Sequence, residues 1–144
     1  MSYVSSLYHV VFGTANRIGS LNPENSGKLY AVLASEISQK KSKAYIINGV
    51  RNHVHILLSL SPEVALSDLV RHIKCNSSKW IKQSKLFPIF DGWSHEYGAF
   101  SLSASHTDAV YKYIENQQQH HLSVTDDEEF ERLVTKAGLR IYRG

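Results

Sequence analysis

The sequence lacks the features of exported, membrane-spanning or disulfide-stabilised proteins. Its 144 residues include a single cysteine, Cys75, so an internal disulfide and a cysteine-rich zinc module are both excluded. No apolar run approaches the roughly 20 residues that cross a bilayer. Residues 1–14 also lack the basic leader and apolar block of a secretory signal. We therefore expect a cytoplasmic protein that contacts no membrane.

Proline and glycine are also scarce, with 3 and 8 residues, and no repeat, low-complexity tract or linker divides the chain. This length is usual for one domain and allows a real hydrophobic core. We expect a single domain over residues 1–144, in which residues 126–144 form an acidic-capped C-terminal helix and tail. The capping box Thr125-Asp-Asp-Glu128 would start that helix, and Gly138 would end it.

The net charge of +3 is unevenly distributed. Between Ser67 and Phe90 a single acid, Asp68, stands among several cations at steps of three and four residues. These cations form one flank of a predicted helix: Arg71, Lys74, Lys82 and Lys85. Such a surface suits a polyanion, most commonly nucleic acid, although it is also compatible with an ordinary solvated helix face.

Periodicity and turn residues predict the order of the elements. We expect a loop at residues 16–27, a turn near Asn48-Gly49, and Ser67 as the cap of the helix that follows. The predicted strands are residues 4–14, 43–50, 51–60 and a segment within 93–105. The predicted helices are residues 28–41, 67–85 (the one capped by Ser67), 107–121 and the C-terminal one.

This order predicts an α+β fold of the ferredoxin-like type, a split β-α-β arrangement around an antiparallel sheet. Helices would cover one face of the sheet. The other face also needs cover, which would come from the 107–121 helix or from a second subunit.

Residues 51–60, RNHVHILLSL, raise a chemical question. Because side chains alternate along a strand, Val54 and Ile56 should face the core while His53 and His55 share the opposite face. The Cα atoms of the two histidines would lie about 7 Å apart, which allows both rings to bind one metal ion. The pattern is equally that of two polar residues on a half-exposed strand.

The predicted 107–121 helix contains AVYKYIENQQQHH. Helical spacing places Tyr113, Gln117 and His120 within an arc of about 60°. The segment therefore offers a nucleophile and a neutral oxygen ligand one turn apart, or else one packing residue and one solvated residue.

NHVHILLSL followed by YIENQ resembles the insertion-sequence HUH tyrosine transposases, the TnpA-like enzymes that act on single-stranded DNA. HUH denotes His-hydrophobic-His, here His53-Val54-His55. IKCNSSKWI resembles the lysine-containing helix of the family, and YGAFSLS resembles its last strand. The likeness spans roughly residues 8–121.

The resemblance implies a ferredoxin-like homodimeric enzyme in a bacterial or archaeal cell. Such an enzyme recognises single-stranded DNA hairpins, cuts through a 5′-phosphotyrosine and rejoins the strands. By this resemblance Tyr113 is the nucleophile, and the ligands of a divalent cation are His53, His55 and Gln117. Neutral ligands of this kind suit Mg²⁺ or Mn²⁺.

The sequence departs from the family pattern in three places. Arg51 stands where many members have proline, and it could contact a phosphate. Tyr111 is a second-choice nucleophile, and His120 could join the metal ligands. Two other functions stay open: a domesticated nickase that acts on chromosomal repeats, and a catalytically silent nucleic-acid-binding module that uses the cationic helix flank.

Overall fold

A four-stranded antiparallel sheet lies at the centre of the computed structural model, which describes residues 2–120 and 132. The strand order is β2-β3-β1-β4. The strands are β1 (Leu7–Gly13), β2 (Lys43–Val50), β3 (His53–Ser59) and β4 (Gly98–Leu102). The helices are η1 (Ala15–Arg17), α1 (Pro23–Gln39), α2 (Leu66–Ser84), η2 (Ala104–His106), α3 (Thr107–Glu115) and α4 (Gln117–His120).

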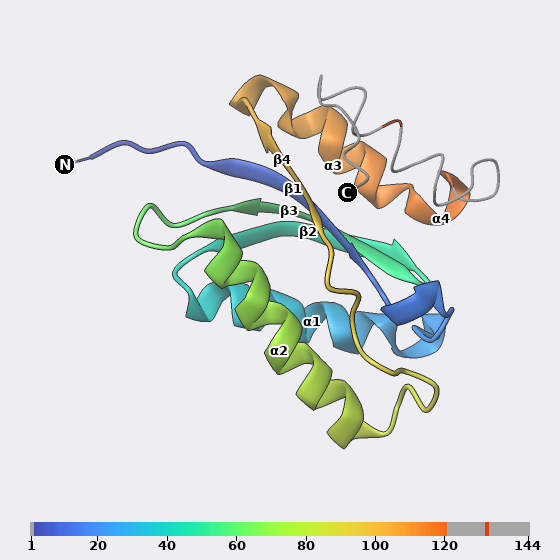
Figure 1. Cartoon of the computed structure of the whole chain (residues 1–144). Coiled ribbons are helices and arrows are strands. Elements are labelled where there is room, and N and C mark those ends of the chain that lie inside the picture. Colours follow the sequence, from blue (N-terminus) through green and yellow to red (C-terminus); the bar gives the residue numbers. More distant parts are fainter. Residues whose placement is uncertain (1, 121–131, 133–144) are drawn as a thin grey trace.

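Helices cover both faces of the sheet. Figure 1 shows α1 and α2 side by side on one face, and α3 across the other face above β2 and β3. The order β1-α1-β2-β3-α2-β4 with β1 and β3 in the centre is the ferredoxin-like arrangement, so the predicted fold class is confirmed. None of the helices within residues 2–120 has the length and apolar character that crossing a membrane requires.

The main hydrophobic core lies between the sheet and the α1–α2 layer. The predicted alternation of β3 is confirmed, because Val54, Ile56 and Leu58 are fully buried in this core. The apolar stripe of α2 packs against them. Its buried members are Leu69, Val70, Ile73, Ser77 and Ile81.

The predicted start of the first helix, residue 28, was wrong. α1 begins at Pro23, inside the segment that its composition had marked as a loop. Asn22 caps the helix, since its side-chain oxygen accepts from the Asn25 backbone N–H at 3.2 Å. Proline is favoured in the first helical turn and Asn at the cap, so Asn22-Pro23 is a helix start as well as a loop signal.

The hairpin turn was predicted near Asn48-Gly49 and lies instead at residues 51–52. β2 continues through Gly49, which pairs with Val54. A Cβ at Gly49 would collide with the His53 carbonyl oxygen and lie 2.9 Å from the Val54 Cα. Glycine is therefore present because two strands approach closely there, and it makes no turn.

Two other predicted boundaries also differ, and a third prediction is not tested. The cap of α2 is Ala65, two residues before the predicted Ser67, and it makes no side-chain cap bond. The predicted 107–121 helix is interrupted at Asn116, which separates α3 from α4. The predicted C-terminal helix and tail, residues 126–144, fall outside the described residues apart from the isolated Arg132.

Candidate active site on the α3 face of the sheet

His53 and His55 lie side by side on the face of β3 that α3 covers. Their ring centroids are 5.0 Å apart, with the planes at 66°. Both side chains are buried, and each Nε2 atom exposes less than 1 Å². His53 Nδ1 lies 2.8 Å from Asn52 Oδ1. Because a carboxamide oxygen only accepts, Nδ1 carries the proton, and the Nε2 of the neutral ring keeps its lone pair.

A third histidine, His9 of β1, completes the cluster, and no local sequence pattern marks it as a site residue. Its Nε2 lies 2.8 Å from His55 Nδ1, and the side chain is only 3% exposed. β1 lies next to β3, and Val11 is the residue paired with His55. The alternation along β1 places His9 on the same face as Val11, but only the strand register brings it to His55.

Tyr113 of α3 reaches this cluster. Its ring centroid lies 5.8 Å from that of His55 and 6.0 Å from that of His9, both in edge-on geometry. The structure therefore brings Tyr113 and the two histidines of the HUH motif to one place. Tyr111, the second-choice nucleophile, is 39% exposed.

Asn48 fixes the end of the tyrosine helix to the sheet. It is the β2 residue that pairs with His55. Its amide donates to the carbonyls of Ile114 at 3.0 Å and Glu115 at 3.1 Å, where the last carbonyls of a helix need donors. Gln118 Nε2 in turn donates to Asn48 Oδ1 at 2.7 Å and to the Gly49 carbonyl at 2.9 Å. We call this group, Asn48 with Gln118, the amide clamp.

Gln117 is fully buried at the first position of α4, beside the amide clamp. The predicted continuous helical face from Tyr113 to Gln117 is interrupted, because Asn116 leaves the helical conformation with φ −96° and ψ 21°. The buried carboxamide lies four residues after the tyrosine, across this break, and its role as a ligand stays a prediction. The side chain of His120 lies outside the described part of the chain, so its predicted role stays a prediction.

The donor set at this site suits a divalent cation. Among the described residues, no group of three or more His, Cys, Asp or Glu side chains could hold a metal. An ion here would therefore need the two imidazoles together with a neutral ligand such as the Gln117 carboxamide. Each of the two histidines is hydrogen-bonded through Nδ1, and in this arrangement Nε2 can bind a metal ion when Nδ1 carries the proton.

The predicted DNA-binding cations divide into two groups. Arg51, Lys82 and Lys85 are exposed. Arg71 is also exposed and lies 3.3 Å from Asp68 in a surface ion pair. Four of the five cations are thus accessible to a phosphate backbone, and their contact with DNA stays a prediction.

Lys74 differs from the other cations because it is half-buried and its ammonium is hydrogen-bonded to backbone carbonyls. It donates to the carbonyl oxygens of Ser94 at 2.8 Å and Glu96 at 3.0 Å, and it lies 5.5 Å from the centroid of the Tyr97 ring. Burial lowers the pKa of Lys74, and the Glu96 carboxylate opposes part of this shift. Lys74 therefore anchors the 94–97 segment to α2.

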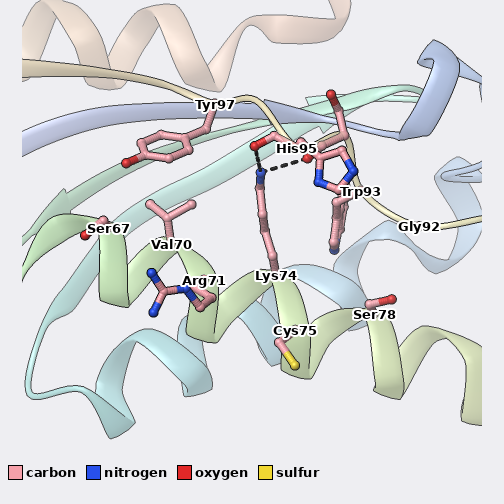
Figure 2. A pocket seen from close by; sticks show the side chains of 11 residues that line it. Ser67, Val70, Arg71, Lys74, Cys75, Ser78, Gly92, Trp93, His95 and Tyr97 are labelled. Atoms are coloured by element: carbon pink, nitrogen blue, oxygen red, sulfur yellow. Dashed lines mark hydrogen bonds between the residues drawn. The ribbon is translucent and has the colours of Figure 1, made fainter.

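A groove of about 550 Å³ opens beside Lys74, between α2 and residues 92–97. Figure 2 shows Lys74 extending from α2 into the groove, between Tyr97 and Trp93. Other side chains that line the groove are Arg71, Cys75, Ser78 and His95. Because α2 and α3 cover opposite faces of the sheet (Figure 1), this groove is separate from the histidine cluster.

Comparison with known proteins places this chain among transposases. Residues 2–117 match the family described as "Transposase IS200 like". The chain is similar to the ISDra2 transposase TnpA of Deinococcus radiodurans, with 27% identity over 121 residues that cover 80% of this chain and 86% of the relative. A solved structure of a protein from the same bacterium, assigned as a transposase, has 25% identity and a TM-score of 0.63, covering 81% and 95% of the two chains.

A further solved structure shows the same fold at lower sequence identity. It is a REP-associated tyrosine transposase bound to a REP hairpin, with a TM-score of 0.65 and 15% identity. The alignment covers 100% of this chain and 89% of the other. Family and fold therefore agree along most of the chain.

Proposed function

The chain belongs to the IS200-like transposase family, and from that premise we propose that it cuts and rejoins single-stranded DNA at hairpin-marked ends through a 5′-phosphotyrosine on Tyr113. Membership implies an enzyme that cleaves DNA and transfers strands. The observation that carries the finer proposal is the position of Tyr113. Its ring lies against His55, on the buried polar face that also holds His53.

The proposed reaction is an exchange of phosphodiester bonds. The Tyr113 oxygen forms a bond to phosphorus while the bond from phosphorus to the 3′-oxygen breaks, and the departing strand takes up the proton that the phenol loses. The phosphotyrosine conserves the energy of the broken bond. A 3′-hydroxyl of another strand then attacks the same phosphorus and releases Tyr113, so rejoining needs no external energy source.

His53, His55 and Gln117 would hold the divalent cation, Mg²⁺ or Mn²⁺. The cation would neutralise charge on a non-bridging phosphate oxygen and fix the orientation of the phosphate. Three neutral ligands leave the full charge of the ion for the phosphate. The amide clamp sets the end of α3, which determines where Tyr113 stands relative to these ligands.

The cationic surface supports binding of a DNA hairpin. A relative with the same fold was solved with a REP hairpin, and this chain presents exposed cations at Arg71, Lys82 and Lys85. Contacts of this kind position a strand through its phosphates without reading its sequence. A homodimer, which the family resemblance implies, is also part of the proposal.

Adduct formation tests this proposal directly. The protein is incubated with a labelled single-stranded DNA that carries a hairpin, with Mn²⁺ or with EDTA, and is then denatured. We expect a denaturation-resistant adduct with Mn²⁺, none with EDTA, and none for Tyr113→Phe, whereas Tyr111→Phe forms it normally. Hairpin binding by Tyr113→Phe should be unchanged.

Two other results would favour a different function. Binding that falls with salt, ignores metal and yields no adduct from any substrate would indicate a catalytically silent module. An adduct with chromosomal repeats, from a gene without matching terminal hairpins in its flanking DNA, would indicate a domesticated nickase.

A further inference from the structure

We propose that His9 is a positioning residue for the metal site: it accepts the Nδ1–H of His55 and so keeps the His55 Nε2 lone pair directed at the cation. The inference rests on the proposed function, because it assigns His9 a role toward the ligand His55. The observation behind it is the distance of 2.8 Å between His9 Nε2 and His55 Nδ1, inside the protein.

Proton counting shows why this bond matters. One proton lies between His9 Nε2 and His55 Nδ1, and two neutral rings can share it in two ways. If His55 donates, its proton is on Nδ1 and its Nε2 is a lone pair that can bind a metal. If His9 donates, the His55 proton is on Nε2, and that nitrogen cannot be a ligand. The bond therefore couples the tautomer of His9 to the metal competence of His55.

The other ligand histidine has an equivalent partner. His53 Nδ1 lies 2.8 Å from Asn52 Oδ1, an atom that only accepts hydrogen bonds. Both histidines of the motif thus present Nε2 and are held through Nδ1. Asn52 precedes His53 in the sequence, whereas the partner of His55 comes from the neighbouring strand β1.

A structural role alone does not account for an imidazole at position 9. The side chain is 3% exposed, and its ring lies 6.1 Å from that of Phe100. Val11, the next residue on the same face of β1, is apolar and buried. An apolar side chain would fill such a site without the desolvation cost of a polar ring. The imidazole instead provides the acceptor that the ligand requires.

Substitutions that differ in where they place an acceptor test the inference. A glutamine carboxamide reaches about as far as Nε2 of histidine and an asparagine carboxamide only about as far as Nδ1. We measure Mn²⁺ affinity of the full chain without DNA. We expect the Mn²⁺ affinity of His9→Phe and of His9→Asn to be about 10- to 100-fold lower than that of the wild type, the loss typical of removing the partner of a ligand histidine. His9→Gln should recover most of the affinity, and His95→Gln, at an exposed histidine, should match the wild type.

Nitrogen NMR of the histidine rings provides a readout that does not depend on metal or activity. In the metal-free wild type we expect the His55 proton on Nδ1, and in His9→Phe we expect it on Nε2. Hairpin binding in EDTA should be equal for all variants, which shows that they fold.

The two proposals fail in different ways. If the wild type binds Mn²⁺ through His53 and His55 but His9→Phe binds it equally well, or if the wild-type His55 proton is on Nε2, the role of His9 is refuted while the proposed function stands. If the wild type binds no Mn²⁺ at these histidines, the metal part of the proposed function is refuted together with the inference.

Discussion

The two faces of the sheet are built from the same strands and differ in almost every chemical respect. On the α1–α2 side, β3 contributes Val54, Ile56 and Leu58, all fully buried in the main core. On the α3 side, the residues that alternate with them are His53, His55 and Leu57, which are also buried. Exposure to water therefore does not explain why this strand carries two polar residues.

The comparison shows what burial costs on each side. Full burial of an apolar side chain stabilises the fold by about 1.5–3 kcal/mol. A buried imidazole instead loses its hydrogen bonds to water, and hydrogen bonds within the protein must replace them. On the α3 face that recovery is visible in the bonds of His53 to Asn52 and of His55 to His9. The α1–α2 face stabilises the fold through apolar burial, whereas the α3 face gives up part of that stability to bury polar side chains.

The largest expected difference comes from truncating two neighbouring residues of β3. His55→Ala should lower the rate of adduct formation by more than about 100-fold, since loss of a ligand's partner alone costs about 10- to 100-fold, and it should leave a folded protein. Ile56→Ala should lower the free energy of unfolding by about 2–5 kcal/mol, with near-normal adduct formation per folded molecule. Urea unfolding and adduct assays on both variants check this. If both substitutions changed the free energy of unfolding and the rate of adduct formation to the same extent, the assignment of stability to one face and activity to the other would be contradicted.

The amide clamp offers the next test. Asn48→Ala removes the donor that holds the Ile114 and Glu115 carbonyls, so Tyr113 should lose its fixed position. We expect the adduct rate to fall by up to about 100-fold, the penalty for a misplacement of about 1 Å, with Mn²⁺ affinity retained.

Asn25→Ala is the matched control on the opposite side. It also removes a carboxamide that donates to a backbone carbonyl, that of Leu86 at 3.3 Å. It should cost about 0.5–1.5 kcal/mol of stability and leave the adduct rate unchanged. A normal rate for Asn48→Ala would show that the clamp does not position the tyrosine.

Alanine substitutions at two glycines should change the free energy of unfolding by smaller amounts and in opposite directions. Gly49→Ala forces a methyl group against the His53 carbonyl beside the site, and such overpacking costs about 1–3 kcal/mol. Gly27→Ala, in α1 with no atom within 4 Å of the new Cβ, should gain about 0.5–1 kcal/mol. Thermal unfolding of both variants measures the difference. A neutral Gly49→Ala would show that β2 and β3 can separate there without cost.

The smallest expected effect concerns Lys74, a half-buried cation on α2. Burial lowers the pKa of Lys74 from the ordinary value of 10.5. At pH values between the lowered pKa and 10.5, the unfolded chain therefore binds more protons than the folded one. The free energy of unfolding should therefore rise with pH in that window. Lys74→Met should flatten this rise, whereas Lys79→Met, at an exposed lysine of the same helix, should not. Urea unfolding at several alkaline pH values measures this rise. Parallel pH profiles for the wild type, Lys74→Met and Lys79→Met would show that Lys74 does not cause it.

The sequence alone predicts the apolar face well. The period of two in β3 and the helical stripe of α2 are local patterns, and burial follows them directly. The same periodicity also separated the two histidines from the core residues. The ferredoxin-like order followed from the sequence of strands and helices, and the family resemblance selected Tyr113 as the proposed nucleophile.

The contacts of the α3 face could not be predicted in the same way. His9 meets His55 only because β1 and β3 pair in one particular register. Asn48 and Gly49 form the strongest local turn signal in the chain, yet one holds α3 and the other allows β2 and β3 to approach closely. Asn22 has the composition of a loop residue and caps a helix. For His9, Asn48 and Gly49 a tertiary contact decided the role of the residue, whereas Asn22 carries two local signals, of which the helix cap is the one realised.

The most direct test of the account is to locate a bound Mn²⁺ ion by its anomalous scattering in crystals of the protein. We predict one ion on the α3 face, in contact with His53 Nε2, His55 Nε2 and the Gln117 side-chain oxygen, with Tyr113 as the neighbouring tyrosine. An ion bound elsewhere, or crystals in excess Mn²⁺ that show none between the two histidines, would contradict the claim that this face of the sheet is a metal-dependent active site.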